Sequence, residues 1–286
     1  MWNILSDLEG LGITGLENVN LFEEEEHTEK IRKGEAVPVV HTEEEFIFDK
    51  KYKCPVCGKE FTSKTVRTGK LKLLDSDSDL KPNYMYMDPM KYDVVACPHC
   101  GYAALTRNYG HITPTQIKTT RERIAANFTG MKESGETHYT IEDAENRYKL
   151  ALANAVVVQM KNSDRAYICL KLGWVFRSEK KRLMADNESG KNDKMIAKLS
   201  DREKDCIKMA YDGLTRSYSS EIPPICGMDS NTLAYLLADL ARQLGDYENA
   251  VKYIGSVLYS KTASARVKDK ARTEKDLIFK EMQAMS

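Results

Sequence analysis

Two short segments of the chain carry residues that could do chemistry. They are Cys-Pro-Val-Cys-Gly at 54–58 and Cys-Pro-His-Cys-Gly at 97–101, and we call each one a knuckle. Two cysteines separated by two residues can turn both sulfurs toward one ion, while proline restricts the backbone and glycine permits a turn that other residues resist. Two knuckles supply the four sulfurs of a closed tetrahedral site. The pattern therefore predicts a structural Zn²⁺ held by Cys54, Cys57, Cys97 and Cys100, although four thiolates also accept iron.

Two catalytic interpretations compete with the structural one. Thiol oxidoreductases place a pair such as Cys-Pro-His-Cys at the start of a helix, where the pKa of the first thiol is lowered. Here Gly101 follows at once, which suits a turn, and one redox dithiol would not need a second knuckle. A catalytic zinc keeps one coordination position open, whereas four cysteines close the site. We therefore expect no enzyme activity.

Three histidines near the knuckles could replace a cysteine as metal ligand. They are His41, His99 and His111. His99 lies inside its own knuckle, where we expect it to face solvent. No grouping of serine, histidine and aspartate, and no paired carboxylates, stands out elsewhere.

The composition describes a protein with apolar cores and no global charge. Of its 286 residues, 42% are hydrophobic and 30% charged, and 43 Lys and Arg balance 43 Asp and Glu. No overall charge draws the chain to nucleic acid or to an anionic membrane. No apolar run approaches a membrane span, and residues 1–7 lack the features of a secretory signal. The seven cysteines, four of them in pairs, favour metal thiolates in a reducing cytoplasm over disulfides.

The pattern divides the chain into four parts. Residues 1–45 form an N-terminal arm and acidic linker. Residues 46–110 form the Cys₄ zinc-ribbon unit, in which short strands lead into the knuckles. Residues 111–139 connect this unit to a helical domain at 140–286. We expect the zinc-ribbon unit and the helical domain to unfold independently.

Alternate aspartates occupy the long gap between the knuckles. Asp75, Asp77 and Asp79 resemble the start of a calcium loop. Leu80 stands where such a loop requires glycine, and Tyr86 stands where it requires glutamate. We therefore reject calcium binding at this segment.

Apolar residues recur at helical spacing from Thr140 onward. A charged stretch at 179–200 interrupts this pattern, and Pro223-Pro224 breaks it again. Asp229 or Ser230 can cap the helix that follows. The fold class is therefore α+β and mainly α, with a small zinc-ribbon β unit followed by a tetratricopeptide-like helical array.

Residues 231–264 resemble a tetratricopeptide repeat, because small residues stand where the paired helices would touch. The matching residues are Leu237, Ala238, Ala241, Gly245, Asp246, Tyr247, Ala250 and Leu258. The charged insertion and Thr262, which stands where proline commonly ends the unit, depart from the repeat pattern. A plain helical bundle would show the same apolar stripes and stays open as an alternative.

The repeat resemblance implies an inner groove lined by aromatic and charged side chains. They are Tyr167, Trp174, Arg177, Tyr235, Asp239 and Arg242. Exposed aromatic and arginine side chains on a concave face favour peptide binding. We expect these six residues to contact a partner.

The whole pattern from about residue 46 onward resembles a bacterial family of unknown function, in which paired Cys-Pro-x-Cys-Gly knuckles precede tetratricopeptide-like helices. The residues that carry the resemblance are Cys54 to Gly58, Asp77-Ser78-Asp79, Tyr92-Asp93-Val94-Val95, Cys97 to Ala104 and Leu233 to Val257. The resemblance implies a bacterial cytoplasmic protein and brings no activity with it.

These observations favour a zinc-stabilised cytoplasmic adaptor that binds a protein or peptide through its helical repeats. The first alternative is a nucleic-acid-binding zinc ribbon, because the first knuckle lies in a basic stretch. Its basic residues are Lys50, Lys51, Lys53, Lys59, Lys64, Arg67, Lys70 and Lys72. Nearby aspartates offset this charge, and we expect some of the lysines to balance the negative thiolates. A thiol or metal-dependent enzyme is the second alternative.

Overall fold

The computed structural model describes residues 41–187 and 190–285. Most of the predicted N-terminal arm lies outside the described residues. His41–Ser286 forms one compact unit. The predicted acidic linker ends at residue 45, and its last three residues form, with Phe46, a 3₁₀ helix (η2, Glu43–Phe46) in which Glu44 and Glu45 are exposed. Phe46 fixes this helix in place, because it is buried in an apolar cluster with Tyr92 and Tyr139.

Within the described residues, six short strands pair into three separate antiparallel hairpins. They are β1 (Ile47–Lys53) with β2 (Glu60–Val66), β3 (Leu73–Ser76) with β4 (Pro82–Tyr84), and β5 (Val94–Ala96) with β6 (Ala103–Leu105). The 3₁₀ helices that follow η2 in this part of the chain are η3 (Thr68–Lys70), η4 (Pro89–Tyr92), η5 (Thr106–Asn108) and η6 (Ala125–Asn127). The first and third hairpins turn through the two knuckles, so each knuckle is held by a pair of strands.

Helices make up most of the described chain from residue 114 onward. The helices are α1 (Pro114–Arg123), α2 (Ile141–Val157), α3 (Asn162–Ala185), α4 (Asp193–Ser220), α5 (Ser230–Gln243), α6 (Tyr247–Tyr259) and α7 (Ala265–Met285). Thr140 caps α2 through a capping box with Asp143, and Asp229 caps α5 by accepting from the Thr232 N–H at 2.7 Å. The predicted α+β, mainly α, class is confirmed.

The charged stretch at 179–200 interrupts the helices less than the sequence predicted. The helix α3 runs on to Ala185, and α4 starts at Asp193. The extension is solvated and carries ion pairs one helical turn apart, such as Arg182 with Glu179 at 2.7 Å and with Asp186 at 3.5 Å. Charged residues at this spacing support a helix even without an apolar face.

One apolar core joins the third hairpin to the helices. Val94 and Leu105 of the hairpin belong to the same buried cluster as Ala144, Tyr148 and Ala151 of α2. The Tyr148 hydroxyl also donates to the carbonyl of Met90 at 2.9 Å. The predicted boundary between 46–110 and 140–286 therefore does not separate two independent cores.

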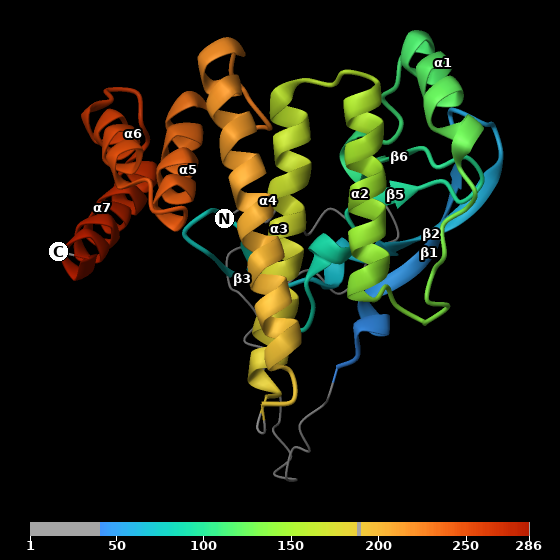
Figure 1. The fold of residues 1–286 in the computed structure, drawn as a ribbon, viewed down its shortest axis with the longest axis horizontal. Coiled ribbons are helices and arrows are strands. Elements are labelled where there is room, and N and C mark those ends of the chain that lie inside the picture. The colour runs from blue at the N-terminus through green and yellow to red at the C-terminus, as the bar shows by residue number, and fades with distance from the viewer. Residues whose placement is uncertain (1–40, 188–189, 286) are drawn as a thin grey trace, which may run out of the picture. The chain divides into compact units, whose positions relative to one another are not determined.

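Figure 1 shows α2, α3 and α4 side by side, with β5 and β6 next to α2 and with α5, α6 and α7 beyond α4. The core contacts connect β5 and β6 to α2, and they connect α2 in turn to α3. None of the described helices combines the length and the apolar character that would let it cross a membrane.

Candidate metal centre

Each knuckle is a turn closed by the same two backbone hydrogen bonds. In the first, the Cys54 N–H donates to the Lys59 carbonyl at 3.0 Å, and the Gly58 N–H donates to the Cys54 carbonyl at 2.9 Å. The second knuckle repeats both bonds, at 2.8 and 3.0 Å. Gly58 and Gly101 have φ angles of +76° and +71°, a left-handed conformation that glycine adopts without a steric penalty. The local sequence therefore determines the shape of each knuckle.

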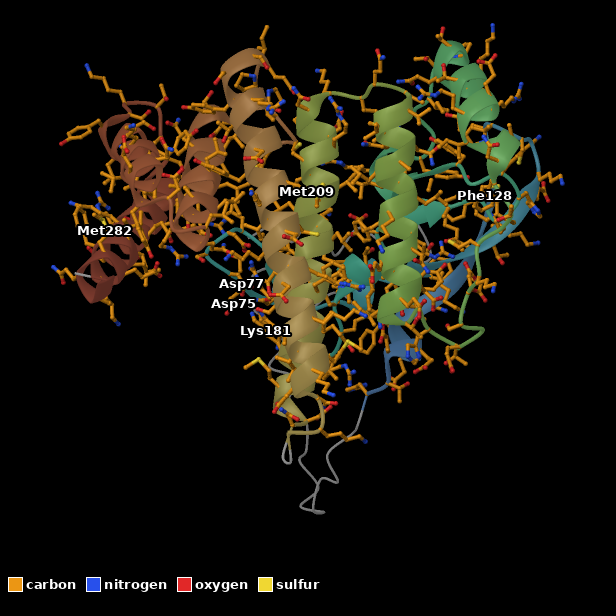
Figure 2. The ribbon with its side chains drawn as sticks, in the orientation of Figure 1. Asp75, Asp77, Phe128, Lys181, Met209 and Met282 are labelled. Carbon is orange, nitrogen blue, oxygen red and sulfur yellow. The ribbon has the colours of Figure 1, made fainter. Side chains whose placement is uncertain are left out.

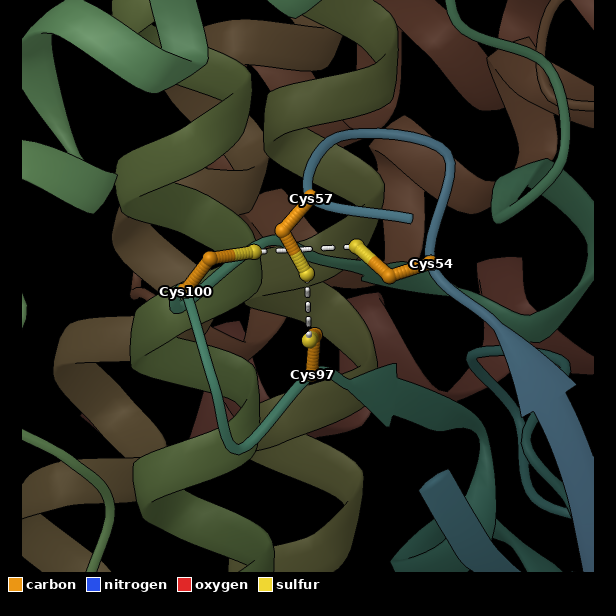
Figure 3. A group of neighbouring side chains, drawn as sticks. All are labelled: Cys54, Cys57, Cys97 and Cys100. Carbon is orange, nitrogen blue, oxygen red and sulfur yellow. Dashed lines mark hydrogen bonds between the residues drawn. The ribbon is translucent and has the colours of Figure 1, made fainter. Parts of the chain in front are cut away.

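The two knuckles bring four sulfurs together, as Figure 3 shows. The Sγ atoms of Cys54 and Cys100 are 3.6 Å apart, and those of Cys57 and Cys97 are 3.7 Å apart. All four lie within 4.8 Å of one another. Zinc–sulfur bonds of about 2.3 Å in a regular tetrahedron require sulfur separations of about 3.8 Å. A disulfide would require about 2.05 Å. The four cysteines therefore form a site that could hold a metal ion, as predicted.

The four thiols cannot all ionise without a cation. A hydrogen bond with Cys100 lowers the pKa of Cys54, and a second hydrogen bond, with Cys97, lowers it further. The same bond with Cys54 raises the pKa of Cys100 well above its ordinary range. One thiolate is thus stabilised by the protons of its neighbours, whereas four thiolates would repel one another. A bound metal cation would remove this conflict and displace the remaining protons.

The site is closed to water on most sides. Cys54, Cys97 and Cys100 are 1%, 0% and 4% exposed. Phe61 and Tyr102 belong to the apolar cluster that surrounds the sulfurs. Cys57, the fourth cysteine, is half-buried. Four cysteine ligands would complete a tetrahedral shell, as in structural zinc sites.

Three side chains distant in the sequence fasten the knuckles to the rest of the unit. Arg121 of α1 donates from Nε to the Val56 carbonyl at 2.7 Å. Asn154 of α2 donates from Nδ2 to the Gly101 carbonyl at 2.8 Å. The ring of Phe128, labelled in Figure 2, covers Gly101 so closely that a Cβ at this position would meet it at 2.6 Å. These three residues could not be found from the sequence, because no local pattern connects them to the cysteines.

The two knuckle glycines predict a matched pair of stability measurements. Gly58→Ala should cost about 1–2 kcal/mol, because alanine disfavours the left-handed conformation. Gly101→Ala should cost about 1–3 kcal/mol more, because its methyl group also meets Phe128, whereas nothing lies within 4 Å at Gly58. Urea unfolding of both variants measures the difference. Equal losses would show that Phe128 does not pack on the second knuckle.

The chain matches the model of one protein family over residues 47–278, which include both knuckles and most of the helices. That family is described as an uncharacterized protein conserved in bacteria (DUF2225). The chain belongs to this family. The resemblance inferred from the sequence is thereby confirmed. No curated protein and no solved structure matches the chain.

The polar residues near the knuckles of this DUF2225 protein lie mostly at the surface. His99 is exposed, with Nε2 at 3.3 Å from the Glu60 carbonyl, and it does not join the four sulfurs. The expectation that it faces solvent is confirmed. The lysines that were expected to balance the thiolates are exposed; they are Lys50, Lys51, Lys53 and Lys59. A further cationic side chain, Arg121, reaches the first knuckle through its hydrogen bond to the Val56 carbonyl.

The predicted inner groove is filled by the chain itself. Trp174 and Tyr235 are 3% exposed and Asp239 is fully buried, so the expectation that these side chains are exposed is wrong. The Trp174 Nε1–H donates to Asp79 Oδ2 at 2.9 Å, and the Tyr235 hydroxyl donates to the Ser78 carbonyl at 2.7 Å. The physical reason is the long gap between the knuckles. It folds into the β3–β4 hairpin, whose acidic turn occupies the polar site between α3 and α5.

Arg177 is the centre of this contact. Its guanidinium lies 2.7 Å from Asp79 Oδ2, 3.2 Å from Asp77 Oδ2 and 2.6 Å from Glu203 Oε1. Figure 2 shows Asp77 close to Lys181, whose Nζ is 3.2 Å from Asp77 Oδ1.

Of the three aspartates that resembled a calcium loop, Asp77 and Asp79 are therefore partners of cationic side chains on α3. Asp75 is exposed and accepts from Asn83 Nδ2 at 2.8 Å. The alternation of the aspartates along the sequence marked this segment as unusual. It did not indicate that Arg177 is the partner of Asp77 and Asp79.

The remaining predicted groove residues also bind within the chain. Arg242 lies 3.1 Å from Asp239, 2.5 Å from Glu274 and 2.8 Å from Glu281, which ties α5 to α7. Tyr167 is half-buried and packs edge-on against Trp174 with ring centroids 6.4 Å apart. The six residues thus stabilise the junction of the β3–β4 hairpin, α3, α5 and α7.

Glu274 predicts a dependence of stability on pH. Burial raises its pKa to about 7, and Asp239 adds to this effect. The folded state therefore holds a proton that the unfolded chain releases near pH 4.5. The resulting stabilisation is full below about pH 4.5 and disappears as the pH rises through 7. It amounts to at most about 3 kcal/mol.

Glu274→Gln should abolish this part of the pH dependence. The variant should be more stable than the wild type at pH 8 and should lose that advantage at pH 5, because glutamine is neutral at both. Urea unfolding at the two pH values measures the effect. Parallel curves for the two proteins would contradict it.

Proposed function

We propose that this DUF2225 protein is a zinc-stabilised cytoplasmic adaptor, which binds a protein or peptide through its helical region and has no catalytic role. The observation that carries the proposal is an open apolar groove between α6 and α7, with a volume of about 280 Å³. Val251, Phe279 and Tyr259 at this groove are 38%, 42% and 91% exposed. Contiguous exposed apolar surface of this kind is typical of protein interaction sites.

Zinc is the ion that best suits the donor set. Four buried thiolates in a closed tetrahedron are the usual ligands of structural zinc. The sulfur separations of 3.6 and 3.7 Å support the same ion. In this proposal the ion joins the β1–β2 hairpin to the β5–β6 hairpin, and it takes no part in a reaction.

The pair of helices α5 and α6 supports a tetratricopeptide-like arrangement. Gly245 turns the chain with a φ of +78°, and Asp246 caps α6 by accepting from the Asn249 N–H at 3.2 Å. Stacked helix pairs of this type form extended surfaces that bind peptides. The helices α6 and α7, whose side chains line the groove, lie at one end of the row of helices (Figure 1).

A nucleic-acid-binding role is the alternative that a specific observation favours. Lys50, Lys51 and Lys53 are exposed along β1 next to the first knuckle. Lysines along one strand could contact phosphates, and such binding would weaken steeply with salt.

Two measurements on the full chain test the proposed function. Affinity capture from a bacterial lysate should retain a defined protein after nuclease treatment. Fluorescence anisotropy with generic duplex and single-stranded nucleic acid across a salt series should show no binding. Salt-dependent nucleic-acid binding together with loss of all captured protein after nuclease treatment would overturn the adaptor in favour of the alternative.

A further inference from the structure

The groove between α6 and α7 is formed by two apolar stripes at helical spacing. Val251, Ile254 and Leu258 face it from α6, and Ile278 and Phe279 face it from α7. Ile254 and Ile278 are buried and form its floor, whereas Val251 and Phe279 are exposed at its rim. Two helices that expose such stripes on either side of a groove provide the surface that an amphipathic helix recognises.

A glycine in the middle of α6 deepens the groove. Gly255 lines it, and a Cβ built at this position would meet no atom within 4 Å. Alanine would therefore fit, and it would stabilise the helix by about 0.5–1 kcal/mol relative to glycine. The space above Gly255 is large enough to receive a side chain from a partner.

One basic side chain lines the groove. It is Lys275, whose Nζ lies 5.7 Å from the centre of the Phe279 ring at the rim. From residue 247 to the end of the chain, eight basic residues stand against five acidic ones. Two of these basic residues form ion pairs with acidic ones, Lys252 with Glu248 and Arg272 with Asp269. A ligand with an acidic flank would complement this surface.

We propose that this groove binds an amphipathic helix of a partner protein, with a bulky apolar side chain over Gly255 and an acidic residue beside Lys275. The inference rests on the proposed adaptor function, to which it adds a site and a partner chemistry. The apolar stripes determine the helical form of the ligand. The lysine determines its charge, and the glycine determines where its largest side chain lies.

Three synthetic peptides of about 16 residues test the partner chemistry. The first is an amphipathic helix with leucines and one phenylalanine on one face and glutamates at its flanks. The second replaces the glutamates by lysines, and the third scrambles the first sequence. Fluorescence anisotropy with the full zinc-loaded chain should show saturable binding of the acidic helix, weaker binding of the lysine helix by about threefold to fivefold, and no binding of the scrambled peptide.

Two substitutions at Gly255 test the site. Gly255→Phe should weaken binding of the acidic helix at least about tenfold, because the ring fills the groove. Gly255→Ala is the matched control, and it should bind the acidic helix much more tightly than Gly255→Phe does, because a single methyl group fills little of the groove. Circular dichroism and zinc content check that both variants fold.

A third variant tests the charge without entering the core. Lys275 is exposed, so Lys275→Glu should fold normally and should reverse the preference from the acidic to the lysine helix. The ratio of the affinities for the acidic and the lysine helix in Lys275→Glu therefore tests the site even if Gly255→Phe does not fold.

Several outcomes would overturn the proposal. Equal binding of the three peptides, or unchanged binding in Gly255→Phe and Lys275→Glu, would show that the groove is not the site. A wild-type dimer in sedimentation velocity that Gly255→Phe dissociates would replace the partner helix by a second copy of the chain. If lysate capture persists while the groove variants have no effect, the adaptor function stands and only this site is wrong.

Discussion

Replacing Cys97 by serine should abolish metal binding and lower the free energy of unfolding by about 5 kcal/mol or more. Structural zinc contributes about 10–16 kcal/mol of apparent binding energy in small zinc domains. Cys97 is fully buried and connects β5 to the sulfur cluster. Its loss should release the β1–β2 hairpin, and it should also loosen α2, because β5 and β6 share a core with that helix. Metal analysis and thermal unfolding followed by circular dichroism measure the two effects.

Cys169→Ala is the matched control for this variant. Cys169 is also buried, but it lies in α3 and outside the sulfur cluster. It should keep one metal ion per chain and lose only about 1 kcal/mol for the sulfur it no longer buries. A Cys97→Ser protein that unfolds at the wild-type temperature would contradict a stabilising role of the metal.

Replacing Arg177 by methionine should cost about 3–5 kcal/mol. The change removes the cation that faces Asp77, Asp79 and Glu203. Asp79 is fully buried, so its carboxylate would remain without its closest charge partner. Burial already raises the pKa of Asp79, and the loss should therefore be smaller at pH 5, where protonation relieves the buried charge, than at pH 8. Urea unfolding at both pH values measures it.

Arg182→Met on the same helix provides the comparison. Arg182 also makes two ion pairs, with Glu179 and Asp186, but its side chain is 60% exposed. Exposed pairs contribute about 0–1 kcal/mol, so this variant should be nearly as stable as the wild type. Similar losses for Arg177→Met and Arg182→Met would mean that the β3–β4 turn does not depend on its buried cation.

The metal site could be predicted from the sequence because its determinants are local. Each knuckle carries its own proline, glycine and cysteine spacing, and only the pairing of the two knuckles is a long-range contact. The start of α2 could also be predicted from local sequence, since Thr140 and Asp143 form the capping box within four residues. Local hydrogen bonds of this kind leave a signature that a single sequence displays.

The filling of the predicted groove by the β3–β4 hairpin could not be predicted, because it depends on contacts between residues far apart in the sequence. Trp174 and Tyr235 have the helical spacing of groove residues, and nothing near them in the sequence indicates a partner. Their partners are Ser78 and Asp79, more than 90 residues away along the chain. Alternating aspartates suggest an exposed loop, and Asp75 is indeed exposed. Asp77 and Asp79 instead form ion pairs with the buried Arg177 on α3.

The division into a zinc-ribbon unit and a helical domain needs a similar correction. The spacing of apolar residues and the composition both change near residue 140, as expected where a new type of secondary structure begins. Val94 and Leu105 nevertheless bury their side chains against α2 rather than within the ribbon. A two-stranded hairpin has too little apolar surface to be stable alone, so it packs on the nearest helix. A metal ion held by the four cysteines would connect the first hairpin to this shared core.

The central claim is that four cysteines hold one zinc ion in a closed structural site. X-ray absorption spectroscopy at the zinc edge of the purified full chain tests it most directly. We predict one zinc ion per chain, surrounded by four sulfur atoms at about 2.3 Å and by no nitrogen or oxygen ligand. A shell with a histidine nitrogen or a water oxygen, or a chain that binds no zinc, would contradict it.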